Sequence, residues 1–213
     1  MATISKGILG GFSGKVGTVV GANWRGKDII RSVPKTGHRT ATDKQLLQQM
    51  KFKLVVTFLQ PLKSIQNLYF GSESGAKSRV NLAVSYTINE AVQVVDDLPA
   101  LVYSKVLITK GDLAGFQNLT ATPQSGGILQ LSWEDNTVQG NASATDRANV
   151  VAYCEELEEF IIWQSVALRS EVSASVTLPS PYVGKEVHLW AYFNNEAETQ
   201  ACNSPYVGTV TVL

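Results

Sequence analysis

Apolar residues recur at two different periods along the chain, and the period changes near residue 100. Between residues 42 and 95 they recur every three or four positions, which is the spacing of one face of an α-helix. From Leu101 onward apolar and polar residues alternate, which is typical of half-buried β-strands. The pattern predicts an α+β protein in which residues 1–100 and residues 101–213 form separate domains.

The first helical pattern begins after Thr42. This residue and Gln45, three positions later, form a capping-box pattern at the start of a helix. The apolar stripe that follows consists of Leu47, Met50, Leu54, Phe58, Leu62, Ile65 and Tyr69. Pro61 lies inside this stripe, so we expect the helix to kink or divide near Gln60, and Gly71 is expected to end it.

A second amphipathic helix is expected over Lys77–Val95, where valines recur at helical spacing. The segment Asp96–Pro99 is expected to end it. Two helices and a short hairpin bury little apolar surface by themselves. We therefore expect their core to be completed by the C-terminal half of the chain or by another subunit.

The alternating half of the chain contains eight strand candidates, separated by turn residues such as Ser125–Gly127 and Asp135–Asn136. Short strands at this spacing predict an antiparallel β-sandwich. The candidates are residues 101–109, 116–122, 127–134, 147–154, 158–165, 171–178, 186–193 and 205–212.

The stretch Gly7–Arg31 holds seven of the 17 glycines of the chain. We expect two short strands, 16–23 and 28–33, joined by a turn at Arg25-Gly26-Lys27, where glycine can adopt positive φ. Glycines weaken a strand that packs alone. This Gly-rich arm is therefore expected to have another backbone against it, from the same chain or from a neighbour.

The net charge of zero conceals two oppositely charged halves. Residues 1–100 contain 13 Lys and Arg against 6 Asp and Glu, whereas residues 101–213 contain 5 against 12. Such an asymmetry is expected of two domains or of head-to-tail association. No apolar run is long enough for a membrane-spanning helix, and we expect synthesis in the cytoplasm without a signal peptide.

Sites for phosphate and metal ions are not expected. The segment Gly10–Lys15 is similar to part of a phosphate-binding loop, but Leu9 and Val16 stand where glycine and Ser or Thr are required. The two histidines, His38 and His188, lie in different halves without ligands at metal-binding spacing. We therefore expect no metal and no cofactor.

Catalytic nucleophiles and paired carboxylates are also not expected. Cys154 lies in an apolar strand, and both it and Cys202 are expected to be buried, inert thiols. The carboxylates of Glu155–Glu159 fall at a predicted hairpin turn. Two interpretations of them stay open: a solvated acidic loop, or an acidic docking surface for the basic half of a neighbour. The chain is therefore not expected to be an enzyme.

Two segments resemble strands of a fibronectin type III or immunoglobulin-like (Ig-like) domain. Leu119–Trp133 resembles the first two strands, in which a tryptophan on the second strand fills the core, and Val187–Phe193 resembles the sixth. The resemblance covers roughly residues 115–213. It implies an all-β Ig-like or fibronectin III-like sandwich, a fold with no inherent chemistry.

Over its full length the chain also resembles an uncharacterised family of about this size from Bacteroidota. The resemblance is carried by Lys6–Gly17, Trp24–Gly26 and Arg31–Pro34, and it continues through Ser104–Leu107 and Trp133–Asn136. It implies no known activity, cofactor or catalytic residue.

We therefore expect a non-enzymatic structural subunit that self-associates through its N-terminal arm, as a virion (head or tail) component or a filament subunit. The alternative is an accessory protein that binds nucleic acid through the basic hairpin. The expected assembly interface consists of Phe12, Val16, Val19, Val20, Trp24 and Ile29. The expected contacts to phosphate or to an acidic partner are Lys15, Arg25, Lys27 and Arg31.

Overall fold

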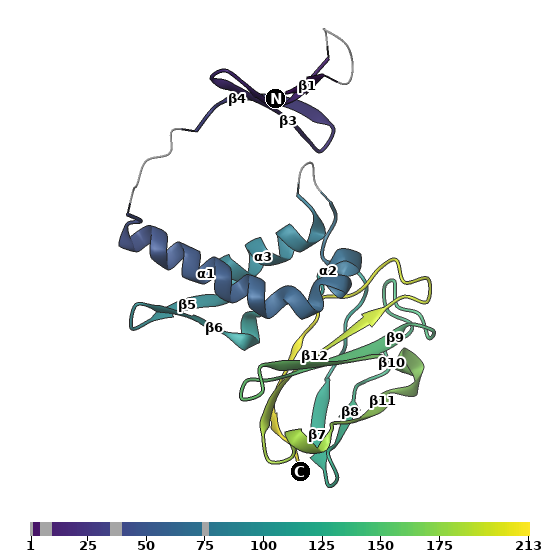
Figure 1. Cartoon of the computed structure of the whole chain (residues 1–213). Coiled ribbons are helices and arrows are strands. Elements are labelled where there is room, and N and C mark those ends of the chain that lie inside the picture. The colour runs from purple at the N-terminus through teal and green to yellow at the C-terminus, as the bar shows by residue number, and fades with distance from the viewer. Residues whose placement is uncertain (1, 5–9, 35–39, 74–76) are drawn as a thin grey trace. The chain divides into compact units, whose positions relative to one another are not determined.

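The computed structural model describes residues 2–4, 10–34, 40–73 and 77–213 (Figure 1). The chain divides into two units, Met1–Thr42 and Asp43–Leu213. This division differs from the boundary near residue 100 that the hydrophobic pattern predicts. The reason lies in the packing of the helices, which share one core with the β-sandwich.

The first unit is a four-stranded antiparallel sheet, here called the N-terminal sheet, in the order β1-β2-β3-β4. The expected hairpin is present between β3 and β4, and Arg25 and Gly26 in its turn have φ of 51° and 79°, as type I′ turns require. The expected strand 16–23 is divided by a turn at Gly17–Thr18, which forms a second hairpin. The strands are β1 (Thr3–Ile4), β2 (Phe12–Val16), β3 (Val19–Trp24) and β4 (Lys27–Ser32).

The expected break at Pro61 is confirmed. Helix α1 (Asp43–Leu59) is followed by a 3-10 turn (Gln60–Leu62) and then by α2 (Lys63–Tyr69). The chain leaves α2 through Gly71, whose φ of 61° suits glycine. The first helical region is therefore two helices divided at the proline, because Pro61 cannot donate a backbone hydrogen bond.

The second helix is shorter than predicted. Helix α3 (Arg79–Glu90) ends before Val92, and the residues that follow form a hairpin of β5 (Val92–Val95) and β6 (Leu98–Leu101). Asp96 and Asp97 make its turn with φ of 49° and 62°. β-branched residues favour extended backbone, and Asp tolerates the left-handed conformation that the turn requires. The prediction of helix up to Val95 was therefore wrong.

The remaining strands form two antiparallel sheets, with the orders β11-β8-β7 and β10-β9-β12-β13. Seven of the eight strand candidates contain most of an observed strand, although in candidate 116–122 the strand begins only at Thr120. The candidate 101–109 is wrong beyond β6: a 3-10 turn (Tyr103–Lys105) leads into irregular chain, held by a 2.7 Å bond from the Ile108 amide to Ser204 Oγ. The strands are β7 (Thr120–Gln124), β8 (Ile128–Ser132), β9 (Arg147–Cys154), β10 (Glu159–Leu168), β11 (Ser173–Thr177), β12 (Glu186–Asn194) and β13 (Tyr206–Thr211).

One hydrophobic core joins the helices to the sandwich, as expected of helices too thin to form a core alone. The ring of Phe58 on α1 lies 5.0 Å from those of Tyr153 on β9 and Phe160 on β10. Trp133, directly after β8, is buried, and its indole N–H donates to the Arg169 carbonyl at 3.0 Å. The tryptophan that the resemblance places in the sandwich core is therefore found there.

Candidate functional site

The N-terminal sheet has two chemically different faces. Residues that pair directly across antiparallel strands lie on the same face of a sheet. Val16 pairs with Val19, and Gly21 pairs with Ile30. The ring of Phe12 lies over Gly21. We call the face that carries Phe12, Val16, Val19 and Ile30 around Gly21 the apolar face. Asn23, Asp28 and Ser32 lie on the same face.

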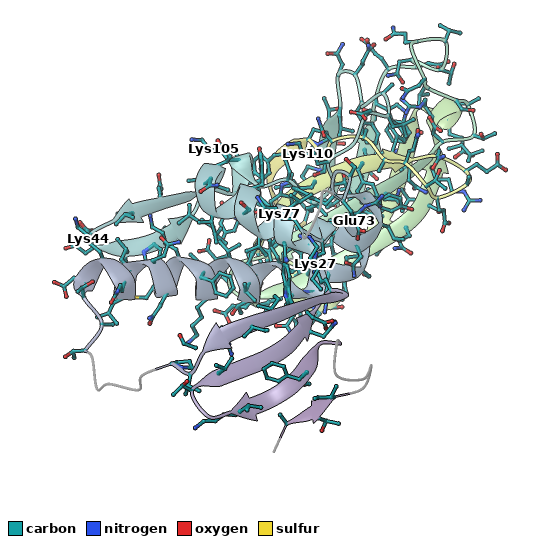
Figure 2. All side chains as sticks on the ribbon, turned by 90° about the horizontal axis from the view of Figure 1, so that it is seen from above. Lys27, Lys44, Glu73, Lys77, Lys105 and Lys110 are labelled. Atoms are coloured by element: carbon teal, nitrogen blue, oxygen red, sulfur yellow. The ribbon has the colours of Figure 1, made fainter. Side chains whose placement is uncertain are left out.

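The opposite face is basic. Val20 pairs with both Lys15 and Arg31, and Trp24 pairs with Lys27. Figure 2 shows Lys27 with the other side chains of the sheet. The Arg25 guanidinium lies 5.4 Å from the Trp24 ring centre at the tip of the hairpin. We call the face formed by Lys15, Val20, Trp24, Lys27, Ile29 and Arg31 the basic face.

The pairing register divides the six expected interface residues into two groups of three. Phe12, Val16 and Val19 lie on the apolar face, whereas Val20, Trp24 and Ile29 lie among the cations of the basic face. The four expected cations are brought together, three on the basic face and Arg25 at its tip. The six were predicted as one surface because the register, which assigns each residue to a face, is not visible in the sequence.

Ile30 is the most exposed apolar side chain of β3 and β4, at 68%. Ile30 was not among the predicted interface residues, which include its neighbour Ile29, a side chain that is 40% exposed. The alternation of side chains along β4 was the available signal, since consecutive residues of a strand point to opposite faces. Val16 and Trp24 are also exposed, at 55% and 50%.

The close backbone approach that the glycines predict occurs inside the sheet. A Cβ atom at Gly21 would lie 2.2 Å from the Phe12 carbonyl oxygen and 2.6 Å from its ring. A Cβ atom at Gly11 would lie 2.1 Å from the Asp28 carboxyl carbon. The glycines therefore let β2 and the residue before it cross closely over β3 and β4, and they do not require a neighbouring molecule.

The acidic segment Glu155–Glu159 forms the turn between β9 and β10, as expected. Glu156 makes an ion pair with Lys185, and the Tyr182 hydroxyl donates to Glu159 at 3.2 Å. Glu155 and Glu158 are exposed. Among the described residues, neither of these two carboxylates has an ion-pair partner.

Cys154 and Cys202 are buried free thiols, as predicted. Burial raises the pKa of the Cys202 thiol to about 11, so the thiolate nucleophile is suppressed at neutral pH. His188 Nδ1 lies 2.8 Å from the Tyr206 hydroxyl, and its ring stacks on Tyr103 at 4.0 Å. Burial lowers the pKa of His188, which favours the neutral imidazole. This histidine therefore packs in an aromatic cluster with Tyr103, Trp190 and Tyr206.

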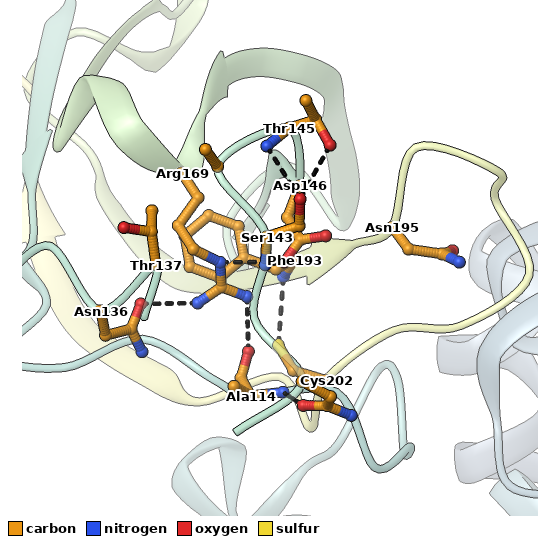
Figure 3. Close-up of polar contacts among 12 residues, drawn as sticks. Ala114, Asn136, Thr137, Ser143, Thr145, Asp146, Arg169, Phe193, Asn195 and Cys202 are labelled. Atoms are coloured by element: carbon orange, nitrogen blue, oxygen red, sulfur yellow. Dashed lines mark hydrogen bonds and ion pairs between the residues drawn. The ribbon is translucent and has the colours of Figure 1, made fainter. Parts of the chain in front are cut away.

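A buried arginine organises one end of the sandwich (Figure 3). Arg169 donates to Asp146 at 3.0 Å, to Asn136 at 2.7 Å and to the Ala114 carbonyl at 2.7 Å. Its guanidinium lies 3.9 Å from the Phe193 ring centre. These contacts satisfy a fully buried cation and tie two loops to the sheet, so its role is structural.

Two further properties bear on the classes of function. Within the described ranges, no group of three His, Cys, Asp or Glu side chains is arranged to hold a metal ion. No helix in the same part of the chain is long and apolar enough to cross a membrane.

Solved structures similar to this chain are fibronectin type III domains. A domain of the human collagen alpha-1(XX) chain has 13% identity and a TM-score of 0.34, and the match covers 46% of this chain and 84% of that domain. A domain of human contactin 1 has 10% identity and a TM-score of 0.34, covering 49% and 83%. The FN5 domain of Drosophila Lar has 12% identity and a TM-score of 0.31, covering 48% and 98%.

No curated protein matches the chain. A family model matches residues 11–208, from the second strand of the N-terminal sheet to the last strand of the sandwich. The chain therefore belongs to DUF6266, a family of unknown function.

Proposed function

We propose that the chain is a non-enzymatic structural subunit that self-associates through its N-terminal sheet. The observation that supports this proposal is that the described residues of the sheet contribute nothing to the buried hydrophobic cluster. That cluster begins at Val55, whereas the first unit is Met1–Thr42. Large apolar side chains on both faces of the sheet are exposed. A sheet is stable when one face is buried against another element.

The amount of apolar surface sets the strength of such an association. Complete burial of a Val or Ile side chain contributes about 1.5–3 kcal/mol. Four apolar side chains of the sheet are between 40% and 68% exposed: Val16, Trp24, Ile29 and Ile30. Burying the exposed part of each contributes about 1 kcal/mol. The total of about 4 kcal/mol does not exceed the entropic cost of association. Apolar contact alone is therefore insufficient, and the assembly needs backbone or charged contacts as well.

Strand β4 offers the backbone contacts. It lies at the edge of the sheet, and all six of its residues are exposed. An edge strand leaves a row of N–H and C=O groups free to pair with another chain. Addition of a strand from a neighbour is a common mode of protein association. A virion head or tail particle, or a filament, is the setting that we propose for this subunit.

Removal of residues 1–42 tests the proposal. The second unit contains the whole described core, so residues 43–213 should stay folded by circular dichroism. Light scattering should give a multiple of the chain mass for the full chain and a single chain mass for residues 43–213. The full-length variant Ile30→Glu should dissociate similarly, whereas Val138→Glu, at a 95% exposed position of the sandwich, should not. Assembly of the truncated chain at the same mass would contradict the proposal.

A second candidate function is supported by the basic face. Lys15, Lys27 and Arg31 gather on one side of the sheet with Trp24, a combination that suits phosphates and a stacked base. This function would make the protein a nucleic-acid-binding accessory protein. Binding of single-stranded or duplex DNA that weakens steeply with salt, together with a monomeric mass, would favour it over self-assembly.

A further inference from the structure

A groove of about 410 Å³ lies on the second unit, between α1, the end of the β5–β6 hairpin and the turn between β9 and β10. Its aromatic lining comes from Phe58, Tyr103, Tyr153 and Phe160. The centres of the Tyr153 and Phe160 rings are 4.6 Å apart, and those of Tyr103 and Tyr153 are 5.7 Å apart. The rings therefore pack as one aromatic cluster, in which Tyr103 and Phe160 are partly exposed to the groove and Phe58 and Tyr153 are buried beneath them.

Two carboxylates complete the lining. Glu155 and Glu158 are the charged side chains among the described residues of this groove, and both are exposed. Burial and the neighbouring Glu155 carboxylate raise the pKa of Tyr103. Burial and the Glu158 carboxylate likewise raise the pKa of Tyr153. The negative charge of both carboxylates thus reaches the aromatic cluster.

Aromatic rings beside carboxylates form a site for an organic cation. A guanidinium or ammonium group is attracted to the face of an aromatic ring, and a carboxylate adds a charge-assisted hydrogen bond. The volume of the groove lies within the range of ligand pockets, which is about 300–1,000 Å³. The groove therefore suits an Arg or Lys side chain presented together with an apolar or aromatic neighbour.

The tip of the N-terminal sheet presents that combination. Trp24, Arg25 and Lys27 follow one another around the β3–β4 turn, and Trp24 is half exposed. The tip carries two positive charges, matching the two negative charges of the groove. We propose that this groove is the docking site for the Trp24–Lys27 tip of a second copy of the chain. This inference rests on the proposed self-association and names the surface that receives the sheet.

Such a contact joins two different surfaces of the same protein. Two copies that exchange tips reciprocally form a closed dimer with two-fold symmetry, whereas a copy that offers its tip to one neighbour and its groove to another makes a heterologous contact. Heterologous contacts generate closed rings or open filaments, according to the rotation between neighbours. The charge asymmetry of the chain agrees with this contact. The tip lies in the basic half of the chain, and the carboxylates of the groove lie in the acidic half.

Charge reversal in the full-length chain tests the inference. The variants R25E/K27E and E155K/E158K each place like charges in the proposed contact. Each should weaken self-association on the order of tenfold or more, since like charges opposed across an interface repel each other. The matched control is E90K/E196K, which makes the same change of charge at two exposed positions outside the groove and should associate like the unmodified chain. Circular dichroism checks that all variants fold.

Mixing the two charge-reversal variants tests whether the tip and the groove that meet belong to different copies of the chain. R25E/K27E and E155K/E158K, each dissociated alone, should associate when mixed, because the reversed tip of one fits the reversed groove of the other. The chain with all four substitutions should also associate. Failure of the mixed sample to associate would overturn the inference, and so would normal assembly of E155K/E158K. After either of these two results, the proposed function would still stand if removal of residues 1–42 dissociated the protein. Assembly that survives the truncation would refute both.

Discussion

Replacement of Arg169 by Met should strongly destabilise the sandwich. Methionine keeps most of the side-chain length but removes the guanidinium, and with it the 3.9 Å contact to the centre of the Phe193 ring. The Asp146 carboxylate, 2% exposed, would then keep only its 2.8 Å bond from the Ser143 amide among its side-chain hydrogen bonds in the described structure. The Asn136 side-chain oxygen and the Ala114 carbonyl would lose their bonds of 2.7 Å. The variant leaves one buried charge uncompensated.

The expected loss is about 4 kcal/mol of unfolding free energy. Removal of one partner of a buried ion pair typically costs about 3–5 kcal/mol, because the remaining charge stays desolvated. The comparison variant is Arg147→Met, which breaks the exposed 3.2 Å pair between Arg147 and Glu198. Exposed pairs contribute about 0–1 kcal/mol, so this variant should be almost neutral.

Urea unfolding followed by tryptophan fluorescence measures both variants. Asp146→Asn should also destabilise, and the double variant R169M/D146N should lose less than the sum of the single losses, because the two groups interact directly. A loss below about 1 kcal/mol for Arg169→Met would refute the reasoning, since it would mean that water or a rearranged loop compensates the buried carboxylate. Additive losses in the double variant would refute it too.

Two further predictions concern the sheet and the core. Gly21→Val should unfold the N-terminal sheet, because its Cβ would lie 2.2 Å from the Phe12 carbonyl oxygen. Limited proteolysis should then cut the chain before residue 43. The control is Gly115→Ala, whose Cβ would meet no atom within 4 Å. The raised pKa of Cys202 should make stability depend on pH: the thiol keeps its full contribution below about pH 9, its ordinary pKa, and loses it as the pH rises toward 11. Unfolding free energies from pH 8 to 11 should show this fall in the unmodified chain and a smaller one in Cys202→Ala; equal slopes would argue against the cysteine as its source.

Local structure was predictable wherever a single residue or a short period decides it. Pro61 divides the first helical region because it cannot donate a backbone hydrogen bond, and Gly26 makes the hairpin turn with positive φ. Strand β9 has the bounds that the sequence predicts, and its residues from Ala148 to Cys154 are all buried, as expected of a short apolar run between turns. The end of α3 was not predictable in this way, since Val92 and Val95 fit both a helical stripe and a hairpin strand.

The candidate site depended on information that no local pattern carries. Glycine spacing correctly indicated close backbone approach, but the partner of Gly21 is Phe12 of the same sheet. The pairing register separates Val19 from Val20 and gathers Lys15 with Arg31. The groove brings together Phe58 and Tyr153, which lie almost a hundred residues apart in the sequence.

By itself the sequence determined the classes of secondary structure, the β-sandwich, the buried thiols and the asymmetry of charge, because these follow from residue type and short-range periodicity. The tertiary structure decided which helices share a core with the sandwich, which side chains lie together on each face of the N-terminal sheet, and where carboxylates meet aromatic rings. Contacts between distant residues depend on strand order, register and packing, and these minimise the free energy of the whole chain and not of any segment.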